Sequence, residues 1–173
     1  FKNHQSGKFE VLKGLIAEAL AADKKIVIFS QYVGMVEIIS QYCKDIGVAA
    51  VSLTGSSSNR GALIDAFQKN KDVKIFIGSL LAGGMGIDLT AASVVIHYDR
   101  WWNASKENQA TDRVHRIGQK NFVQVFKLVT KGTLEEKIDK LIAKKSDLFA
   151  RFLEKDEEMF KSLGRQEIIE LLN

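Results

Sequence analysis

The sequence QATDRVHRIGQ, at residues 109–119, places two arginines one helical turn apart beside a carboxylate and an amide. If Ser105 caps a helix that runs to about Ile117, with Gly118 just past its end, the helical repeat gathers four polar side chains on one face. These side chains are Gln109, Asp112, Arg113 and Arg116. Two guanidinium groups held on a helix present rigid sets of donors that suit a polyphosphate better than lysines do. The stretch therefore predicts a surface that faces phosphate.

The same helix has an apolar side. Ala110, Val114 and Ile117 share a second face, which we expect to point toward a core. The alternative to a phosphate surface is a solvated face on which Asp and Arg form ordinary pairs three and four residues apart. The sequence around the stretch favours the phosphate surface.

Three segments upstream carry a resemblance to a known family. They are SLLAGGMGIDLT at residues 79–90, VVIHYD at 94–99 and RWWNAS at 100–105. In this order and spacing, residues 79–119 resemble the second RecA-like lobe of Swi/Snf-type ATPases, the double-stranded DNA translocases of helicase superfamily two.

The resemblance extends in both directions. KIVIFSQY (25–32) is similar to the family's first strand in this lobe, and LTGSSSNRGALIDAF (53–67) is similar to its Gly-Ser loop and helix. VFKLVTKGTLEEKI (125–138) resembles the family's segment after the arginines, and its sequence is closest to that of bacterial members. Roughly residues 6–152 are covered.

Apolar spacing alone predicts alternating helices and strands. We expect a helix after Ser6, helices at about residues 33–46 and 59–68, and strands at about residues 26–29, 48–53, 73–79, 93–98 and 122–129. Thr133 and Glu136 form a capping box that opens a long helix. The alternation predicts an α/β fold with a mostly parallel sheet, helices on both faces and a C-terminal helical brace, which the resemblance identifies as RecA-like. Ligands are then expected at loops that leave the carboxyl ends of the strands.

Composition fits one domain. The 173 residues, 46% of them hydrophobic, suit a single lobe over residues 1–173, with a core at about 6–130 and a helical extension at about 131–173. The net charge of +4, with its basic surplus in residues 1–130, is compatible with a phosphate partner. Neither a long apolar run nor a signal pattern occurs, so no membrane partner is expected. Cys43 is expected in the core, and the scattered histidines predict no metal site.

The sequence lacks the parts that hold a nucleotide in a P-loop enzyme. No G-x-x-x-x-G-K-[S/T] loop occurs. The resemblance implies that ATP and Mg²⁺ are held mainly by a preceding lobe, so the chain looks like a piece of a longer protein and is expected to hydrolyse no ATP alone. It also implies that Arg113 and Arg116 act as arginine fingers across the cleft between the lobes.

The resemblance assigns further residues to the nucleotide. Gln109 and Asp112 orient the arginines or touch ATP, and Gly86 and Asp88 lie in the loop that joins the nucleotide and DNA surfaces. The glycines of that loop, at 83, 84 and 86, permit close backbone approach, although a plain turn explains them equally well.

The DNA contacts implied by the resemblance are Gln31, Thr54, Gly55, Ser56, Ser79, Trp102 and Asn103. Short hydroxyl groups and backbone amides at strand ends grip phosphates without reading bases. The alternatives are that Ser57 or Ser58 caps the next helix and that the tryptophans pack in the core, which is the role we expect for Trp101.

Four positions depart from the family pattern. Leu81 stands where Lys or Arg is usual, Asp88 stands where Asn is usual, and Arg100 and Ala104 replace prolines around the Trp-Asn turn. We expect the fold to survive and DNA affinity to be lower than in typical members.

The sequence therefore predicts the second motor lobe of an ATP-dependent double-stranded DNA translocase or remodeller. Its expected partners are double-stranded DNA, the N-terminal RecA-like lobe of the same protein and a DNA-bound protein substrate. The expected location is the bacterial cytoplasm and nucleoid, or the nucleus in a eukaryote. The alternatives are a nonhydrolytic DNA-binding or protein-interaction module, and a self-contained methyltransferase or dehydrogenase.

Overall fold

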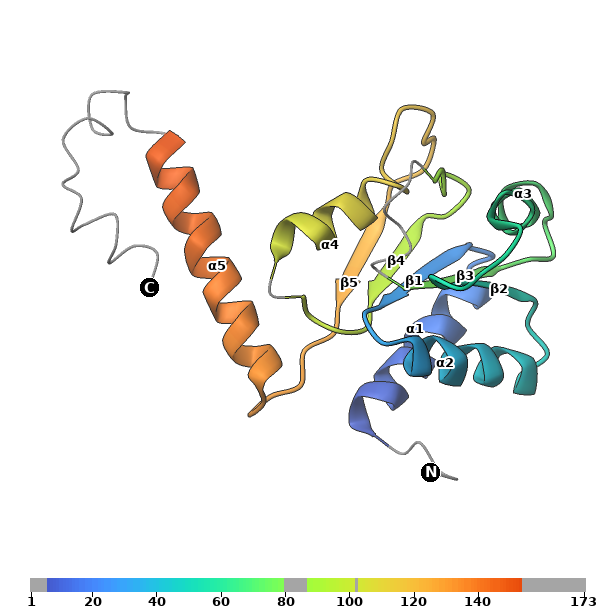
Figure 1. The fold of residues 1–173 in the computed structure, drawn as a ribbon, viewed down its shortest axis with the longest axis horizontal. Coiled ribbons are helices and arrows are strands. Elements are labelled where there is room, and N and C mark those ends of the chain that lie inside the picture. The colour runs from blue at the N-terminus through green and yellow to red at the C-terminus, as the bar shows by residue number, and fades with distance from the viewer. Residues whose placement is uncertain (1–5, 80–86, 102, 154–173) are drawn as a thin grey trace.

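The computed structural model describes residues 6–79, 87–101 and 103–153, with side chains to residue 146. A parallel sheet lies at its centre, with the strand order β2-β3-β1-β4-β5 (Figure 1). The strands are β1 (Ile26–Ser30), β2 (Ala50–Leu53), β3 (Ile75–Ser79), β4 (Val94–His97) and β5 (Gln124–Lys127). The predicted α/β fold is confirmed, and all four strand pairings are parallel.

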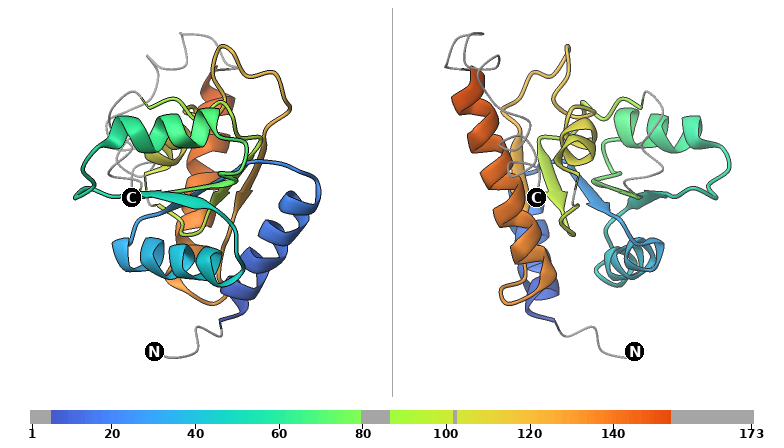
Figure 2. Two further views of the ribbon diagram at one scale, coloured as in Figure 1. Left: turned by 90° about the vertical axis from the view of Figure 1, so that its right-hand side faces the viewer. Right: turned by 60° about the vertical axis from the view of Figure 1, so that its left-hand side comes forward.

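Helices cover both faces of this sheet (Figures 1 and 2). α1 (Gly7–Ala21) and α2 (Val33–Asp45) pack on one face, and α3 (Arg60–Lys69) and α4 (Ala104–Thr111) pack on the other. The last helix, α5 (Leu134–Leu153), follows β5 and runs along the end of the molecule beside that edge strand (Figure 1).

The continuous apolar runs of the central strands follow from this two-sided cover. Every residue of β1, β3 and β4 is buried, because side chains on both faces of these strands meet helices. In β1, Ile26 and Ile28 join the core under α1 and α2, whereas Val27 and Phe29 join the core under α3 and α4. The alternation of side chains along one strand therefore supplies both cores.

Local signals fix several helix ends. The Ser6 hydroxyl accepts a hydrogen bond from the Phe9 amide at 3.1 Å and caps α1. After α2, Gly47 adopts a φ of +69°, which a side chain would disfavour, so the predicted stop at this glycine is confirmed. At α5, the Thr133 hydroxyl accepts from the Glu135 amide. The predicted capping box would have the Glu136 carboxylate accept from the Thr133 amide, but this carboxylate accepts from the Gly132 amide at 2.8 Å.

Two further expectations concern the described residues. Cys43 is fully buried in α2, and this burial raises the pKa of its thiol to about 11, as expected for a core residue. In the described ranges, none of the helices has the length and apolar character needed to cross a bilayer.

His97 in β4 provides a test of the core. Its ring is fully buried, stacks on Phe29 with ring centroids 5.6 Å apart, and shares a hydrogen bond of 2.9 Å between Nε2 and the Thr111 hydroxyl. Burial, together with the charges of Lys127 and Arg100, lowers the pKa of His97 to about 3. Unfolding restores the usual His97 pKa near 6.5. Between that pH and about 3, His97 is therefore protonated in the unfolded chain and neutral in the folded chain.

We therefore predict that stability falls by up to about 1.4 kcal/mol per pH unit as the pH drops below about 6.5. His97→Gln should flatten this slope between pH 6.5 and 5, measured by denaturant unfolding of the chain. His115→Gln, at an exposed histidine, is the control and should leave the slope as it is. Equal slopes in the original chain and His97→Gln would contradict the assignment.

Candidate functional site

The helix that carries the quoted stretch is shorter than predicted. α4 is capped by Asn103, whose Oδ1 accepts from the Ser105 amide at 3.1 Å, and it ends at Thr111 instead of continuing to Ile117. A tertiary hydrogen bond accompanies the early end. The carbonyl of Arg113 accepts from the Leu89 amide at 2.9 Å, so it is already engaged where helix continuation would require the amide of Ile117.

Residues 112–119 instead form a series of turns, which we call the arginine turn. Within it, the Arg116 amide donates to the Val114 carbonyl at 3.2 Å and the Gln119 amide to the Arg116 carbonyl at 2.9 Å. Val114 is fully buried, as expected, but Ile117 is fully exposed, so the prediction that Ile117 faces the core is wrong.

The turn still brings the predicted polar side chains together. An open hollow of about 470 Å³ is lined by Gln109, Asp112, Arg113, His115, Arg116 and Ile117. Arg113 is half-buried, and among the described residues none hydrogen bonds to its buried Nε. Arg116 is exposed. The sequence did not point to His115 and Ile117 as lining residues. Ile117 was assigned to the apolar face by a helical repeat that stops at Thr111, and His115 was considered only as a metal ligand.

Gln119 holds this turn in place, a role that the sequence analysis missed. Its Nε2 lies within hydrogen-bonding distance of three carbonyl oxygens, and its Oε1 accepts from the Asn121 amide at 2.9 Å. The three carbonyls are those of Thr90 (3.1 Å), Ala92 (2.8 Å) and Val114 (3.2 Å). Thr90 and Ala92 directly precede β4, so this amide joins the arginine turn to the amino end of a central strand. The Gly118-Gln pair, with φ +105° at Gly118, is the only local signal for such a turn in this stretch.

A second group of predicted residues lies at the opposite edge of the sheet, where strands end. Gln31 follows β1, and its amide donates to the Asp99 carboxylate at 3.2 Å. The Ser30 hydroxyl bonds to the same carboxylate. Asp99 is buried, and burial raises its pKa despite these hydrogen bonds.

The loop after β2 presents the predicted short polar residues. Thr54 is half-buried, and Gly55 and Ser56 are exposed. Ser57 accepts from the Thr54 amide at 2.9 Å through its hydroxyl, so it shapes this loop, while Asn59 is the N-cap residue of α3. The alternative that Ser57 or Ser58 caps the helix is therefore wrong.

The remaining predicted residues divide into buried, exposed and undescribed. Ser79 ends β3 with its side chain buried. Asp88 is exposed, and its carboxylate accepts from the Thr90 amide at 3.0 Å, a turn contact that Asn makes equally well. Gly86 and Trp102 lie outside the described residues, as do Leu81, Gly83 and Gly84.

The structure therefore separates the predicted site into two parts. Gln31, the 54–56 loop and Asn103 lie at the carboxyl edge of the sheet, as expected for this group. The arginine turn lies elsewhere, because α4 carries the chain back across the sheet and the turn is bonded beside the amino end of β4. Asn103 caps the N-terminal end of α4, and the arginine turn follows its C-terminal end.

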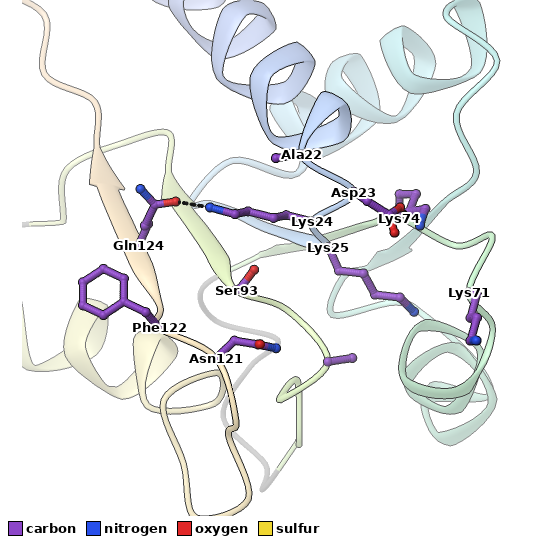
Figure 3. Close-up of a pocket in the computed structure, with 11 residues that line it drawn as sticks. Ala22, Asp23, Lys24, Lys25, Lys71, Lys74, Ser93, Asn121, Phe122 and Gln124 are labelled. Atoms are coloured by element: carbon purple, nitrogen blue, oxygen red, sulfur yellow. Dashed lines mark hydrogen bonds and ion pairs between the residues drawn. The ribbon is translucent and has the colours of Figure 1, made fainter.

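A larger hollow does not coincide with either part. It measures about 740 Å³, lies at the amino edge of the sheet and is lined by four lysines, which point in different directions (Figure 3). Lys24 donates to the Gln124 side chain at 2.7 Å, Lys25 donates to the carbonyls of Phe67 and Asn70, and Lys74 pairs with Asp23 at 2.7 Å. Because three of these four ammonium groups already have structural partners, we assign no ligand to this hollow.

Comparisons with known proteins find relatives of this chain. The family model for the helicase conserved C-terminal domain matches residues 7–118. An uncharacterized ATP-dependent helicase of Mycoplasma pneumoniae is 40% identical over 96% of this chain and 16% of its own length. The putative ATP-dependent helicase/translocase YwqA of Bacillus subtilis is 43% identical over 96% of this chain and 18% of its own length. The chain thus spans under a fifth of these relatives.

Two solved structures share both fold and sequence with this chain. The SWI2/SNF2 ATPase core of Sulfolobus solfataricus in complex with double-stranded DNA is 42% identical, with a TM-score of 0.70 over 94% of this chain and 34% of its own. The C-terminal part of the Fun30 ATPase domain is 38% identical, with a TM-score of 0.75 over 79% of this chain and 45% of its own.

The anchoring of the arginine turn gives a prediction. Gln119→Leu removes two N–H groups that are shared among three carbonyls and should destabilise the chain by about 1–3 kcal/mol in denaturant unfolding, because those part-buried carbonyls lose their partner. Gln41→Leu is the matched control, since Gln41 is an exposed residue of α2 whose side chain bonds to Asp45 one turn on. A loss in the control as large as in Gln119→Leu would refute the anchoring role.

Proposed function

Since the chain belongs to the helicase conserved C-terminal domain family, as the second lobe of a Swi2/Snf2-type ATPase, we propose that it forms half of a motor that uses ATP to move along double-stranded DNA. The observation that carries this proposal is the arginine turn, in which Arg113 and Arg116 line one open hollow with Gln109 and Asp112. The names of the relatives favour a motor over a nonhydrolytic module, and the family match disfavours a methyltransferase or dehydrogenase.

In this proposal the arginines stabilise charge on the phosphoryl group that is transferred. The main chain of Arg113 is fixed by the Leu89 amide, and Gln119 fixes the following residues, so little reorganisation is needed when a phosphate approaches. The guanidinium of Arg113 retains donor capacity, because no described residue bonds to its Nε. Gln109 and Asp112 border the same hollow and orient the two arginines.

ATP is the substrate in this proposal, and the chain supplies only part of its site. Within the described ranges, His, Cys, Asp and Glu side chains form no group of three that could hold a metal ion. The sequence also lacks a phosphate-binding loop. We therefore place Mg²⁺ and most contacts to ATP on the N-terminal lobe, with the arginine turn facing it across the cleft.

DNA is proposed to contact the opposite end of α4. Gln31, Thr54, Gly55, Ser56 and Asn103 lie at the carboxyl edge of the sheet, where their amides and hydroxyl groups suit phosphate oxygens. The family resemblance adds Trp102 to these proposed DNA contacts. Ser79 is buried, so we propose that it supports this edge of the sheet without contacting the DNA backbone directly. Such contacts carry no base specificity, as a translocase requires.

The arginine assignment predicts a kinetic defect without a folding defect. In the full-length enzyme, Arg113→Ala or Arg116→Ala should lower DNA-stimulated ATP turnover at least about a hundredfold, because the charge that the guanidinium stabilises develops mainly in the transition state. ATP affinity and the melting temperature should change little. Lysine at either position should restore little turnover, since an ammonium cannot make the forked, planar contact.

Two controls make this prediction decisive. Lys69→Ala removes an exposed cation of α3 that pairs with Asp65 at 2.9 Å, outside both parts of the site, and should retain most of the turnover. The chain alone should show no ATP turnover. Near-normal turnover in both arginine variants would reject the assignment, and so would lost turnover that is accompanied by a collapsed melting temperature.

A further inference from the structure

A buried ion-pair network lies between the two parts of the site. At its centre is Glu107 on α4, which is fully buried. Its Oε1 accepts from the Trp101 amide at 2.8 Å, and its Oε2 accepts from the Arg100 guanidinium at 2.6 Å. The Lys127 ammonium of β5 lies 3.3 Å from the same Oε2. One carboxylate therefore joins the segment after β4, helix α4 and the edge strand.

Arg100 extends this network to the last helix. It is 3% exposed, and its second terminal nitrogen lies 3.0 Å from Oδ1 of Asp139 on α5. Asp139 is half-exposed, so the network runs from the core to the surface. Its two cations and two carboxylates balance, which satisfies the charges that burial would otherwise penalise. This contact also explains why an arginine is accommodated where the resemblance leads one to expect proline.

The network is poorly explained by stability alone. A buried ion pair recovers little more than its desolvation cost, and well-packed apolar residues often replace it without loss. Its distinctive property is geometric, because the planar Arg100 guanidinium contacts α4 and α5 at once and lysine cannot make both contacts. Glu107 also fixes the main chain of Trp101, which lies two residues before the DNA-facing Asn103. Glu107 itself is on the same helix as Gln109.

We propose that Glu107 is a positioning residue that couples the DNA-facing end of α4 to the arginine turn, and that the Arg100–Asp139 contact makes this coupling depend on the placement of α5. The inference rests on the proposed function. When DNA engages the residues after β4, the Trp101 amide and Arg100 transmit the displacement to Glu107, and hence to the helix that leads into Arg113 and Arg116. DNA stimulation of ATP turnover is the quantity that this coupling controls.

The experiment uses the full-length enzyme and compares Glu107→Gln, Arg100→Lys, Asp139→Asn and the double variant Glu107→Gln/Arg100→Met. Measured quantities are the ratio of DNA-stimulated to DNA-free ATP turnover, the DNA concentration for half-maximal stimulation, and the melting temperature. Glu107→Gln should lower the ratio at least about tenfold, and Asp139→Asn should lower it about threefold at an unchanged melting temperature. Arg100→Lys should lower the ratio while keeping the charge balance.

The double variant separates positioning from folding. Removing both charges should recover most of the melting temperature that Glu107→Gln loses, because the two groups left without these partners, Lys127 and Asp139, are each partly exposed to water. The stimulation ratio should nevertheless stay low. Recovery of the ratio together with the melting temperature would overturn the proposal. So would an unchanged ratio in Asp139→Asn, whose half-exposed site keeps the test valid even if Glu107→Gln fails to fold.

Two controls, Asp65→Asn and the unaltered enzyme, distinguish failure of the positioning role from failure of the proposed function. Asp65→Asn breaks an exposed pair with Lys69 on α3 and should leave the ratio unchanged. If the unaltered enzyme shows DNA-stimulated turnover and the network variants match it, only the positioning role fails. If the unaltered enzyme shows no such turnover, the motor assignment itself fails.

Discussion

The hydrogen-bonded position of β1 between β3 and β4 is the constraint on which the rest of the lobe depends. All five residues of β1 are buried, with side chains alternating between two cores. Each parallel strand must then be reached by a connection that crosses one face of the sheet, and this places α2 on one side and α3 and α4 on the other, while α1 precedes β1 and packs on the same face as α2. The loops that end the strands consequently gather at one edge, and the crossover helices return to the opposite edge, where α4 leads into the arginine turn.

Much of this arrangement could be predicted from the sequence, because it depends on local patterns. Short apolar runs such as residues 26–29 identified strands covered on both faces, and Gly47 marked the end of a helix. The segments that decide the fold also resemble one family closely, so the RecA-like architecture followed from their order. Strand ends shifted by one or two residues, since hydrogen bonding to neighbours sets them.

The site was less predictable, because tertiary contacts shape it. Helical periodicity placed the two arginines on a helix, but the Leu89 amide takes the Arg113 carbonyl and the chain turns instead. The polar set still converges, since four of its members are close in sequence however the backbone folds. Gln119 and Glu107 could not have been ranked from sequence alone, because their partners come from segments whose proximity only the fold creates. Arg100 became interpretable for the same reason.

The buried thiol of Cys43 has a practical consequence for studying motion in this lobe. With a pKa of about 11 and no solvent exposure, the thiol is almost entirely protonated at neutral pH and shielded from alkylating dyes. A cysteine introduced at an exposed position, such as Ile117 beside the arginines, would therefore be the reactive handle within this chain. A fluorophore there, paired with one elsewhere in the full-length protein, would report distance changes by energy transfer without first removing the native cysteine of the lobe.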